Sequence, residues 1–266
     1  MFTTRLISGI VLVALAIVVV SAGGLVLFAV NGVISMVGLF ELYRVLKIEK
    51  TPLAAIGYLA CIAYYSLIWF DSHEYVTLMA IAVLMLLMGF YVFTFPKYKT
   101  EEVTAAFFGV FYVAVMLSYL YQVRQMPDGG YLVWLIFISS WGCDTCAYCA
   151  GKLFGKHKMT PTLSPKKTIE GAVGGVAGSA LLGYLYAVLL GQRMIMVKNP
   201  YIACAVACGV AAMISQVGDL AASAIKRNHQ VKDYGHLIPG HGGILDRFDS
   251  MIFTAPAIYL VITLLT

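Results

Sequence analysis

The sequence predicts an all-α membrane protein: a polytopic helical bundle of about nine transmembrane helices, with a polar site inside the membrane that faces the cytoplasm. Hydrophobic residues make up 61% of the 266 residues and charged residues only 12%, and the mean hydropathy is +0.87. Soluble domains are about half apolar and about a quarter charged. Apolar runs near the roughly 20 residues that a helix needs to cross a bilayer recur along the chain. These observations exclude a soluble protein and leave little chain for a separate soluble domain.

Nine apolar segments can be placed along the chain. They cover residues 5–22, 25–46, 53–70, 76–95, 103–123, 130–150, 170–191, 201–225 and 244–265. Runs such as "LISGIVLVALAIVVV" are apolar on every side, as a helix in lipid requires, whereas barrel strands alternate apolar and polar residues. The first run is interpreted as a span rather than a cleaved signal peptide, because similar spans follow at once. We expect one membrane domain, residues 1–266, in which residues 1–125 form spans without motifs and residues 126–266 carry the polar motifs.

The basic residues are divided unequally between the two sides of the membrane. An odd number of spans places the chain ends on opposite sides and separates the loops into two sets. All of the 18 Lys and Arg residues lie on the side of the N-terminus except Arg124, Arg193 and Lys198. Cytoplasmic loops are enriched in basic residues, so the N-terminus and the polar site are predicted to be cytoplasmic, in a protein of the cell (inner) membrane. This bias also explains the net charge of +5, which gives no reason to expect nucleic acid as a partner.

Small residues in the sixth and seventh segments indicate close helix packing. Gly171 and Gly175 are spaced four residues apart in the seventh segment, which brings them to one helix face. Three of the six cysteines, Cys143, Cys146 and Cys149, have a C-x2-C-x2-C spacing that resembles part of an iron–sulfur ligand set. They lie in an apolar segment without a nearby fourth ligand. We therefore expect them to pack as small hydrophobic side chains.

The eighth segment carries charged groups that are costly to insert into a membrane. Such groups cost a few kcal/mol on insertion scales, which makes them candidates for function. One polar stripe at helical spacing runs toward its cytoplasmic end: Gln216, Asp219, Ser223, Lys226 and Arg227. A lone aspartate would be expected to pair with the nearby lysine or cap a neighbouring helix. The whole stripe favours a functional site instead.

A turn rich in proline and glycine precedes the ninth segment. In "IPGHGG" the backbone N–H groups of Gly242 and Gly243, followed by a helix N-terminus, are placed to bind phosphate oxygens. His241 can contact phosphate, transfer a proton or form a structural hydrogen bond. Asp246 and Asp249 lie one turn apart at the start of the helix. Acidic residues also occur there without a function, because the helix dipole favours them.

A third group of polar residues surrounds the loop after the sixth segment. The loop "GKLFGKHKMTPTLSPKKTIEG" brings five lysines and Glu170 to the cytoplasmic side, and Asp144 lies nearby inside the sixth segment. Carboxylates of Asp144, Asp219 and Asp246 at one depth would repel each other unless cations lay among them. Mg²⁺ prefers oxygen ligands and is often held by one or two carboxylates plus substrate phosphates. The residues thus predict a metal-dependent enzyme that acts on phosphate groups at the inner face, with a lipid as one substrate.

The C-terminal half resembles a known enzyme family. The run from Ser223 to Asp249, "SAIKRNHQVKDYGHLIPGHGGILDRFD", is similar to the signature of the phosphatidate cytidylyltransferases, also called CDP-diacylglycerol synthases. The loop "FGKHKMTPTLSPKKTIEG" and the preceding "DTCAYCAGKLFG" also resemble this family. The chain departs from the family's D-x-G-A-Y-x-x-G pattern at one position, where Cys146 replaces a small residue.

The resemblance implies a reaction of phospholipid biosynthesis: CTP and phosphatidic acid give CDP-diacylglycerol and pyrophosphate. It implies a requirement for Mg²⁺ beside a monovalent cation such as K⁺, and assembly as a homodimer among membrane lipids. The implied metal ligands are Asp219, Asp246 and Asp249, and the implied catalytic residues are Asp219, Asp246, Lys226 and Arg247. Substrate-binding roles are implied for Ser223, Arg227, Lys167, Glu170, His241, Gly242, Gly243 and Asp144.

Two other interpretations of the polar site stay open at this point. A CTP-dependent lipid kinase of the polyprenol or dolichol type would transfer the γ-phosphoryl group and release CDP. An ion-coupled transporter would use Asp144 and Asp219 as ion ligands or proton carriers. The acidic residues cluster at the cytoplasmic end beside lysines suited to phosphate, which favours an enzyme.

Overall fold

The structure is a computed structural model that describes residues 2–266, with side chains from residue 7 onward. The helices of the N-terminal half are α1 (Phe2–Ala22), α2 (Gly24–Val45), α3 (Pro52–Trp69), α4 (Val76–Thr94), α5 (Thr100–Gly109) and α6 (Met116–Gln125). Those of the C-terminal half are α7 (Gly129–Leu132), α8 (Trp134–Phe137), α9 (Cys143–Phe154), α10 (Ile169–Leu190), α11 (Pro200–Asn228) and α12 (Leu245–Leu265). A short antiparallel hairpin, β1 (Lys158–Thr160) and β2 (Ser164–Thr168), connects α9 to α10.

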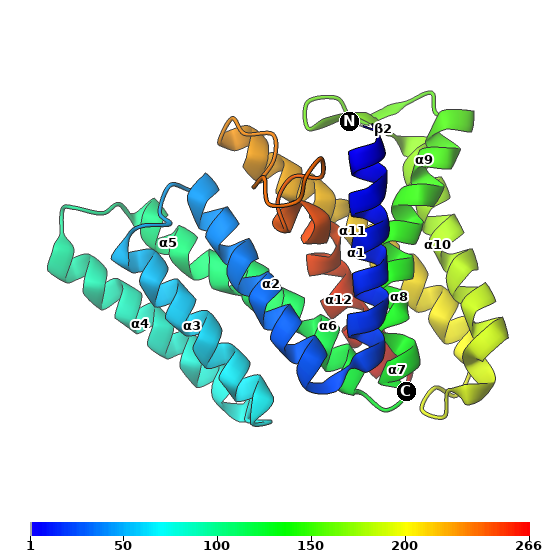
Figure 1. Ribbon diagram of the computed structural model, residues 1–266, viewed down its shortest axis with the longest axis horizontal. Helices are drawn as coiled ribbons and strands as arrows, with labels where there is room; N and C mark the ends of the chain where they lie inside the picture. The colour runs from blue at the N-terminus through cyan, green and yellow to red at the C-terminus, as the bar shows by residue number, and fades with distance from the viewer. Residues whose placement is uncertain (1) are drawn as a thin grey trace.

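The prediction of an all-α membrane bundle is confirmed. In the described part of the chain, eight helical stretches are long and apolar enough to cross a bilayer. They match the second to ninth predicted segments within a few residues. The first predicted segment corresponds to α1. The part of α1 from residue 7 to residue 22 is a shorter apolar helix than the other eight stretches. The N-terminus and the C-terminus lie at opposite ends of the bundle (Figure 1), as an odd number of spans requires.

Several helices begin where local sequence chemistry predicts a helix start. Thr51 and Asn199 accept hydrogen bonds from the backbone three residues later, and Pro52 and Pro200 occupy the first helical positions. Thr168 caps α10 by accepting from the N–H of residue 171 at 3.1 Å. Such caps satisfy N–H groups that have no partner inside the helix. The cap at Thr168 also holds the end of β2 against the start of α10.

Helices α9 to α12 pack side by side and form the part of the bundle that contains the polar motifs (Figure 1). The glycines of α10 allow this packing. A Cβ added to Gly175 would lie 2.9 to 3.1 Å from atoms of Ala147 and Cys143, and one added to Gly178 would lie 2.6 Å from Cys146. The predicted close packing is therefore confirmed, and two cysteines of the C-x2-C-x2-C run act as packing residues.

Two spanning stretches contain a π-helical turn, at Val110–Val115 between α5 and α6 and at Ile138–Gly142 between α8 and α9. Such wide turns are rare and often occur near functional sites. The second turn carries Ser140, whose hydroxyl lies 2.9 Å from the hydroxyl of Ser250 in α12. This hydrogen bond joins the helix that carries Asp144 to the helix that carries the acidic motif.

Helix α1 is attached to the bundle near both of its ends. The Ser8 hydroxyl donates to the carbonyl of Pro239 at 3.0 Å, and Nε of Arg124 donates to the carbonyl of Val20 at 3.2 Å. Between these contacts, α1 runs along a cavity rather than packing closely against its neighbours. The arrangement leaves space for a ligand between α1 and the rest of the protein.

Candidate active site

Asp246 connects the end of α11, the following loop and the start of α12. Its Oδ2 accepts hydrogen bonds from the backbone N–H of Tyr234 at 2.7 Å and of Gly243 at 2.9 Å. Its Oδ1 accepts from Nζ of Lys226 at 2.9 Å, and the residue is only 6% exposed. Lys226 also lies over the Tyr234 ring, 5.2 Å from its centre. Both oxygens of Asp246 are thus engaged, so a metal would have to share them with these donors.

Tyr234 is the centre of the loop between α11 and α12. Its hydroxyl donates to the carbonyl of Ala222 at 3.1 Å, and its carbonyl accepts from Arg44 of α2 at 2.5 Å. Burial raises the pKa of the Tyr234 phenol above its usual value, so the phenol stays a hydrogen-bond donor at neutral pH. The loop is therefore anchored to three helices.

The "IPGHGG" turn is closed by its own backbone. The N–H of Ile238 donates to the carbonyl of Gly242 at 2.8 Å, and the N–H of His241 donates to the carbonyl of Ile238 at 2.9 Å. Gly240 and Gly242 have φ angles of +76° and +85°, which side chains rarely permit. The turn thus requires glycine at these two positions.

The N–H groups after this turn are occupied by carboxylates of the protein itself. Gly243 donates to Asp246, while Ile244 and Leu245 donate to the two oxygens of Glu41 at 3.1 and 2.8 Å. The N-terminus of α12 does hold an anion, as the helix dipole favours. That anion is a side chain of α2, whereas the sequence suggested phosphate. The N–H of Gly243 is turned toward Asp246.

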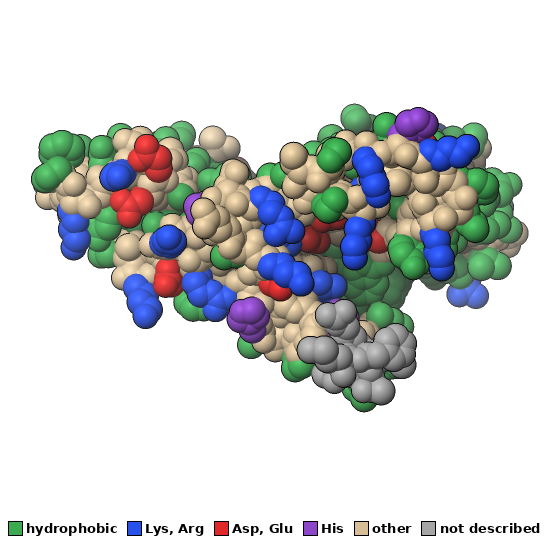
Figure 2. Space-filling view, turned by 90° about the horizontal axis from the view of Figure 1, so that it is seen from above, with side chains coloured by type: hydrophobic (Ala, Val, Ile, Leu, Met, Phe, Trp, Pro, Cys, Tyr) green, Lys and Arg blue, Asp and Glu red, His purple; other side chains and the backbone are tan. Residues whose placement is uncertain are grey.

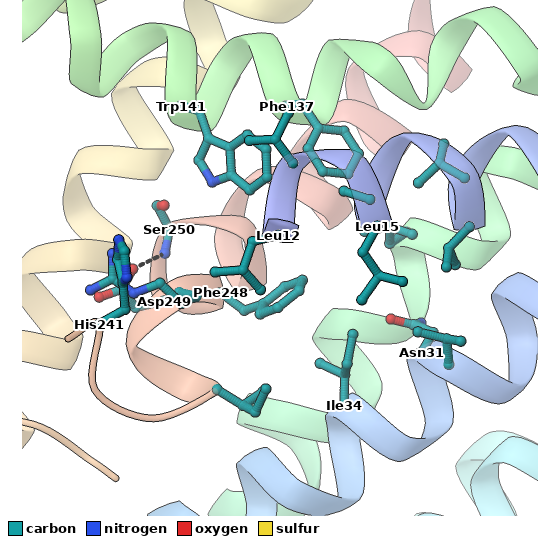
Figure 3. Close-up of a pocket in the computed structure, with 18 of the residues that line it drawn as sticks. Leu12, Leu15, Asn31, Ile34, Phe137, Trp141, His241, Phe248, Asp249 and Ser250 are labelled. Carbon is teal, nitrogen blue, oxygen red and sulfur yellow. Dashed lines mark hydrogen bonds between the residues drawn. The ribbon is translucent and has the colours of Figure 1, made fainter. Parts of the chain in front are cut away.

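A cavity of about 360 Å³ lies between α1, α2 and the start of α12. Figure 3 shows its apolar part, lined by Leu12, Leu15 and Ile34 beneath Phe137, and its polar part beside His241. The polar end is formed by Asp144, His241, Asp246, Arg247 and Asp249. We call this the lipid-facing cavity. Its apolar length and charged end suit an amphipathic molecule.

Two groups at the polar end of the lipid-facing cavity lack partners. Nδ1 of His241 and Nε of Arg247 are buried without a hydrogen bond to any described residue. A buried polar atom without a partner costs about 1–3 kcal/mol, and native proteins keep few of them. A bound ligand with acceptor and donor oxygens would satisfy both groups.

A second cavity, of about 320 Å³, lies between α9, β2, α10 and α11. Its charged and amide side chains are Asp144, Lys152, Lys166, Lys167 and Gln216. We call this the basic cavity. Figure 2 looks onto this end of the bundle, where Lys and Arg side chains surround a hollow with acidic side chains inside it. Three lysines around one small cavity suit a ligand with several phosphate groups.

The two cavities share Asp144. Its carboxylate is close enough to those of Asp219 and Asp249 for the three charges to repel each other. Asp219 forms an ion pair with Lys167, and the Ser223 hydroxyl donates to its Oδ1 at 3.5 Å. The structure thus brings together the acidic residues that the sequence placed in three separate segments.

The chemistry of these carboxylates fits a divalent cation that a substrate helps to hold. In the described part of the chain, no three His, Cys, Asp or Glu side chains gather closely enough to bind a metal by themselves. Asp144, Asp219 and Asp249 nevertheless supply oxygen donors and excess negative charge. Mg²⁺ commonly takes one or two protein carboxylates and completes its shell with substrate phosphates and water.

Five residues with implied substrate-binding roles line neither cavity: Arg227, Glu170, Ser223, Gly242 and Gly243. Arg227 is exposed and donates to the carbonyl of Val231 at 3.4 Å, because one residue past Lys226 the helix has turned away by about 100°. Glu170 accepts from the N–H groups of Lys156 and His157 and contacts the His157 ring at 2.6 Å. It holds the loop before the hairpin.

Sequence reasoning missed two residues of α2 that contact the site. Glu41, which is 3% exposed, binds the start of α12, and Arg44 binds the loop before it. Glu41 is an acidic residue inside an apolar segment. The criterion that selected Asp219 would have selected it too.

The chain is similar to characterised enzymes over nearly its whole length. The sequence profile described as "Cytidylyltransferase family" matches residues 3–265. A protein of Bacillus subtilis (strain 168) named phosphatidate cytidylyltransferase is 31% identical, over 98% of this chain and 97% of its own length. One of Staphylococcus aureus (strain COL) with the same name is 30% identical, over 97% and 98%. With nearly its whole length matched, this chain belongs to the cytidylyltransferase family.

Proposed function

We propose that this protein transfers the cytidylyl group of CTP to phosphatidic acid and releases pyrophosphate, which makes CDP-diacylglycerol. The names of its relatives support this reaction. The observation that carries the proposal is the pair of cavities with opposite chemistry that meet at Asp144. A reaction between a lipid and a nucleotide needs two such compartments joined at the reacting atoms.

The lipid-facing cavity suits the phosphatidic acid. Its wall from α1 and α2 offers apolar surface for an acyl chain, and burial of such a chain is favourable by about 25 cal/mol per Å². The unpartnered groups of His241 and Arg247 are suited to the lipid phosphate and the oxygens near it.

The basic cavity suits the triphosphate of CTP. Lys152, Lys166 and Lys167 provide positive charge, and the hairpin brings the last two next to the start of α10. Lysines act as point charges, which suits phosphates that move apart during the reaction. In this arrangement Lys167, held by Asp219, is placed to stabilise the leaving pyrophosphate.

The chemical step requires little proton transfer. An anionic oxygen of the lipid phosphate forms a bond to the α-phosphorus of CTP, and the bond from this phosphorus to the oxygen that bridges to the β-phosphorus breaks. The electron pair leaves with pyrophosphate. Because the nucleophile is already charged, alignment and charge neutralisation provide most of the catalysis.

We assign the divalent cation to Asp219 and Asp249. Bound there, Mg²⁺ would neutralise charge on phosphate oxygens as it moves to the leaving group. Asp246 joins them only if Lys226 or a backbone donor shares its oxygens. A monovalent cation such as K⁺ stays a prediction from the family resemblance.

The proposal also places the reaction at the cytoplasmic face, on the basis of the charge bias of the loops. A cysteine introduced in the loop of residues 155–168 tests this orientation. If a reagent that cannot cross the membrane labels this cysteine only when it is added outside the cell, the orientation is wrong. Assembly as a homodimer is a further part of the proposal, checked by cross-linking in native membranes.

The decisive experiment follows the fate of labelled CTP. Purified protein in vesicles with phosphatidic acid and Mg²⁺ should move label from the α-phosphate of CTP into the lipid. Label that appears only in free CDP would indicate a lipid kinase. Ion transport in vesicles without any turnover of CTP would indicate a transporter.

A further inference from the structure

The carboxylate of Glu41 reaches across the protein to the start of α12. It accepts from the N–H groups of Ile244 and Leu245, which are more than 200 residues away in the chain. These N–H groups have no acceptor inside their own helix, and a negative charge is favoured there by the helix dipole. Helix α2 thus provides the N-terminal cap of α12.

The surrounding backbone is built closely around this carboxylate. A Cβ atom added to Gly235 or to Gly243 would meet the Glu41 carboxylate at less than the distance that real contacts allow. One helical turn after Glu41, Arg44 donates to the carbonyl of Tyr234 at 2.5 Å. Two side chains of α2 therefore hold both the loop and the helix that follows it.

These contacts lie directly beside the polar end of the lipid-facing cavity. Leu245 precedes Asp246, and the same turn of α12 carries Arg247 and Asp249 into the cavity lining. Glu41 itself lines neither cavity. Glu41 is therefore placed to act on the reaction through the loop and the helix that it holds, without touching a ligand in either cavity.

We propose that Glu41 is a positioning residue: it fixes the first turn of α12 so that Arg247 and Asp249 face the junction of the two cavities. A buried acidic residue in a membrane helix is costly, and an apolar residue would be cheaper if packing alone were required. The two hydrogen bonds to the carboxylate instead fix the position of the first turn of α12. The catalytic part of the inference rests on the proposed function.

Hydrogen–deuterium exchange tests the contact without any turnover. In Glu41→Gln, the amide replaces one acceptor oxygen by a donor, which cannot bind an N–H group. Exchange of the peptide that covers residues 243–246 should become about 10- to 100-fold faster. Glu102→Gln is the matched control, because Glu102 caps α5 by accepting from the N–H of Lys99 at 2.8 Å. The control should leave exchange at residues 243–246 unchanged.

Kinetics separate positioning from general stability. Misplacement of Arg247 and Asp249 should lower kcat by about 100-fold. The KM for CTP should change less than kcat, because the lysines of the basic cavity lie on elements that Glu41 does not touch. The Glu102→Gln variant should keep both constants.

Three results would overturn the inference: unchanged exchange at residues 243–246, faster exchange with unchanged kcat, or faster exchange spread over all helices. If Glu41→Gln does not fold, Glu41→Asp keeps the charge but shortens the side chain, and it should show the same local changes to a smaller degree. A parent protein that makes no CDP-diacylglycerol would refute the proposed function. The exchange measurement would still decide whether Glu41 holds α12.

Discussion

The lipid-facing cavity and the basic cavity differ in which parts of the chain build them. The basic cavity consists of residues 144–216, all from the C-terminal half. The lipid-facing cavity takes most of its apolar wall from α1 and α2, and its charged side chains from the start of α12 and from Asp144 of α9. The basic cavity, which suits a charged and soluble ligand, is formed by motifs that lie close together in the chain. A site for a lipid needs a long apolar surface, and any span can provide it without a recognisable motif.

Substitution of the carboxylates near the junction of the two cavities should give the largest losses of activity. The effects on stability should differ between Asp219 and Asp246. Asp219→Asn removes a proposed metal ligand and should lower kcat/KM by about 100- to 1,000-fold at saturating Mg²⁺. The thermal stability in detergent should change little, because Asp219 is partly exposed. Retained activity would remove Asp219 from the metal site.

Asp246→Asn should lower both activity and stability. The substitution removes the negative charge that balances the largely buried Lys226, and breaking a buried ion pair costs about 3–5 kcal/mol. The three hydrogen bonds of Asp246 hold the loop before α12, so the melting temperature should fall together with the activity. Equal melting temperatures for Asp246→Asn and the parent would show that the ion pair contributes nothing to the fold.

Lys167→Met tests the basic cavity alone. The loss of a charged contact to phosphate should raise the KM for CTP by about 10- to 100-fold. The KM for phosphatidic acid should stay near that of the parent, since Lys167 does not line the lipid-facing cavity. Initial rates with each substrate varied in turn measure both constants, and equal increases in both would contradict the separation of the two cavities.

Leu15→Trp tests the lipid-facing cavity in the same way. The larger side chain fills part of the apolar wall and should raise the KM for phosphatidic acid by about tenfold, with the KM for CTP unchanged. Leu59→Trp is the matched control, because Leu59 is exposed on α3 and lines neither cavity. A similar effect of both variants would show that α1 is not the wall of the lipid site.

Arg227→Ala should give the smallest effect. Its guanidinium contacts only the carbonyl of Val231 among the described groups, outside both cavities. We expect less than about a twofold change in either KM, as for surface substitutions away from special contacts. An increase in the KM for CTP would restore the substrate-binding role that the family resemblance implies.

Much of the fold could be predicted because its causes are local. Apolar length alone identified the nine segments, and caps such as Thr51 with Pro52 or Asn199 with Pro200 defined where helices begin. The helical spacing from Asp219 to Lys226 also predicted one polar stripe on this helix. It did not predict that Asp219 pairs with Lys167 of the hairpin while Lys226 pairs with Asp246. Those choices depend on how three separate segments approach each other.

By itself, the sequence determined the fold class, where the apolar helices lie along the chain, and the kind of chemistry. These properties follow from composition, period and residue type, which act over one or two helical turns. Only the tertiary structure decided which anion occupies the N-terminus of α12, and that Asp144 stands between two cavities. A carboxylate and a phosphate are equally suited to exposed N–H groups. Which of the two binds depends on the helix that packs against these N–H groups. In this protein that helix is α2, which provides the carboxylate of Glu41.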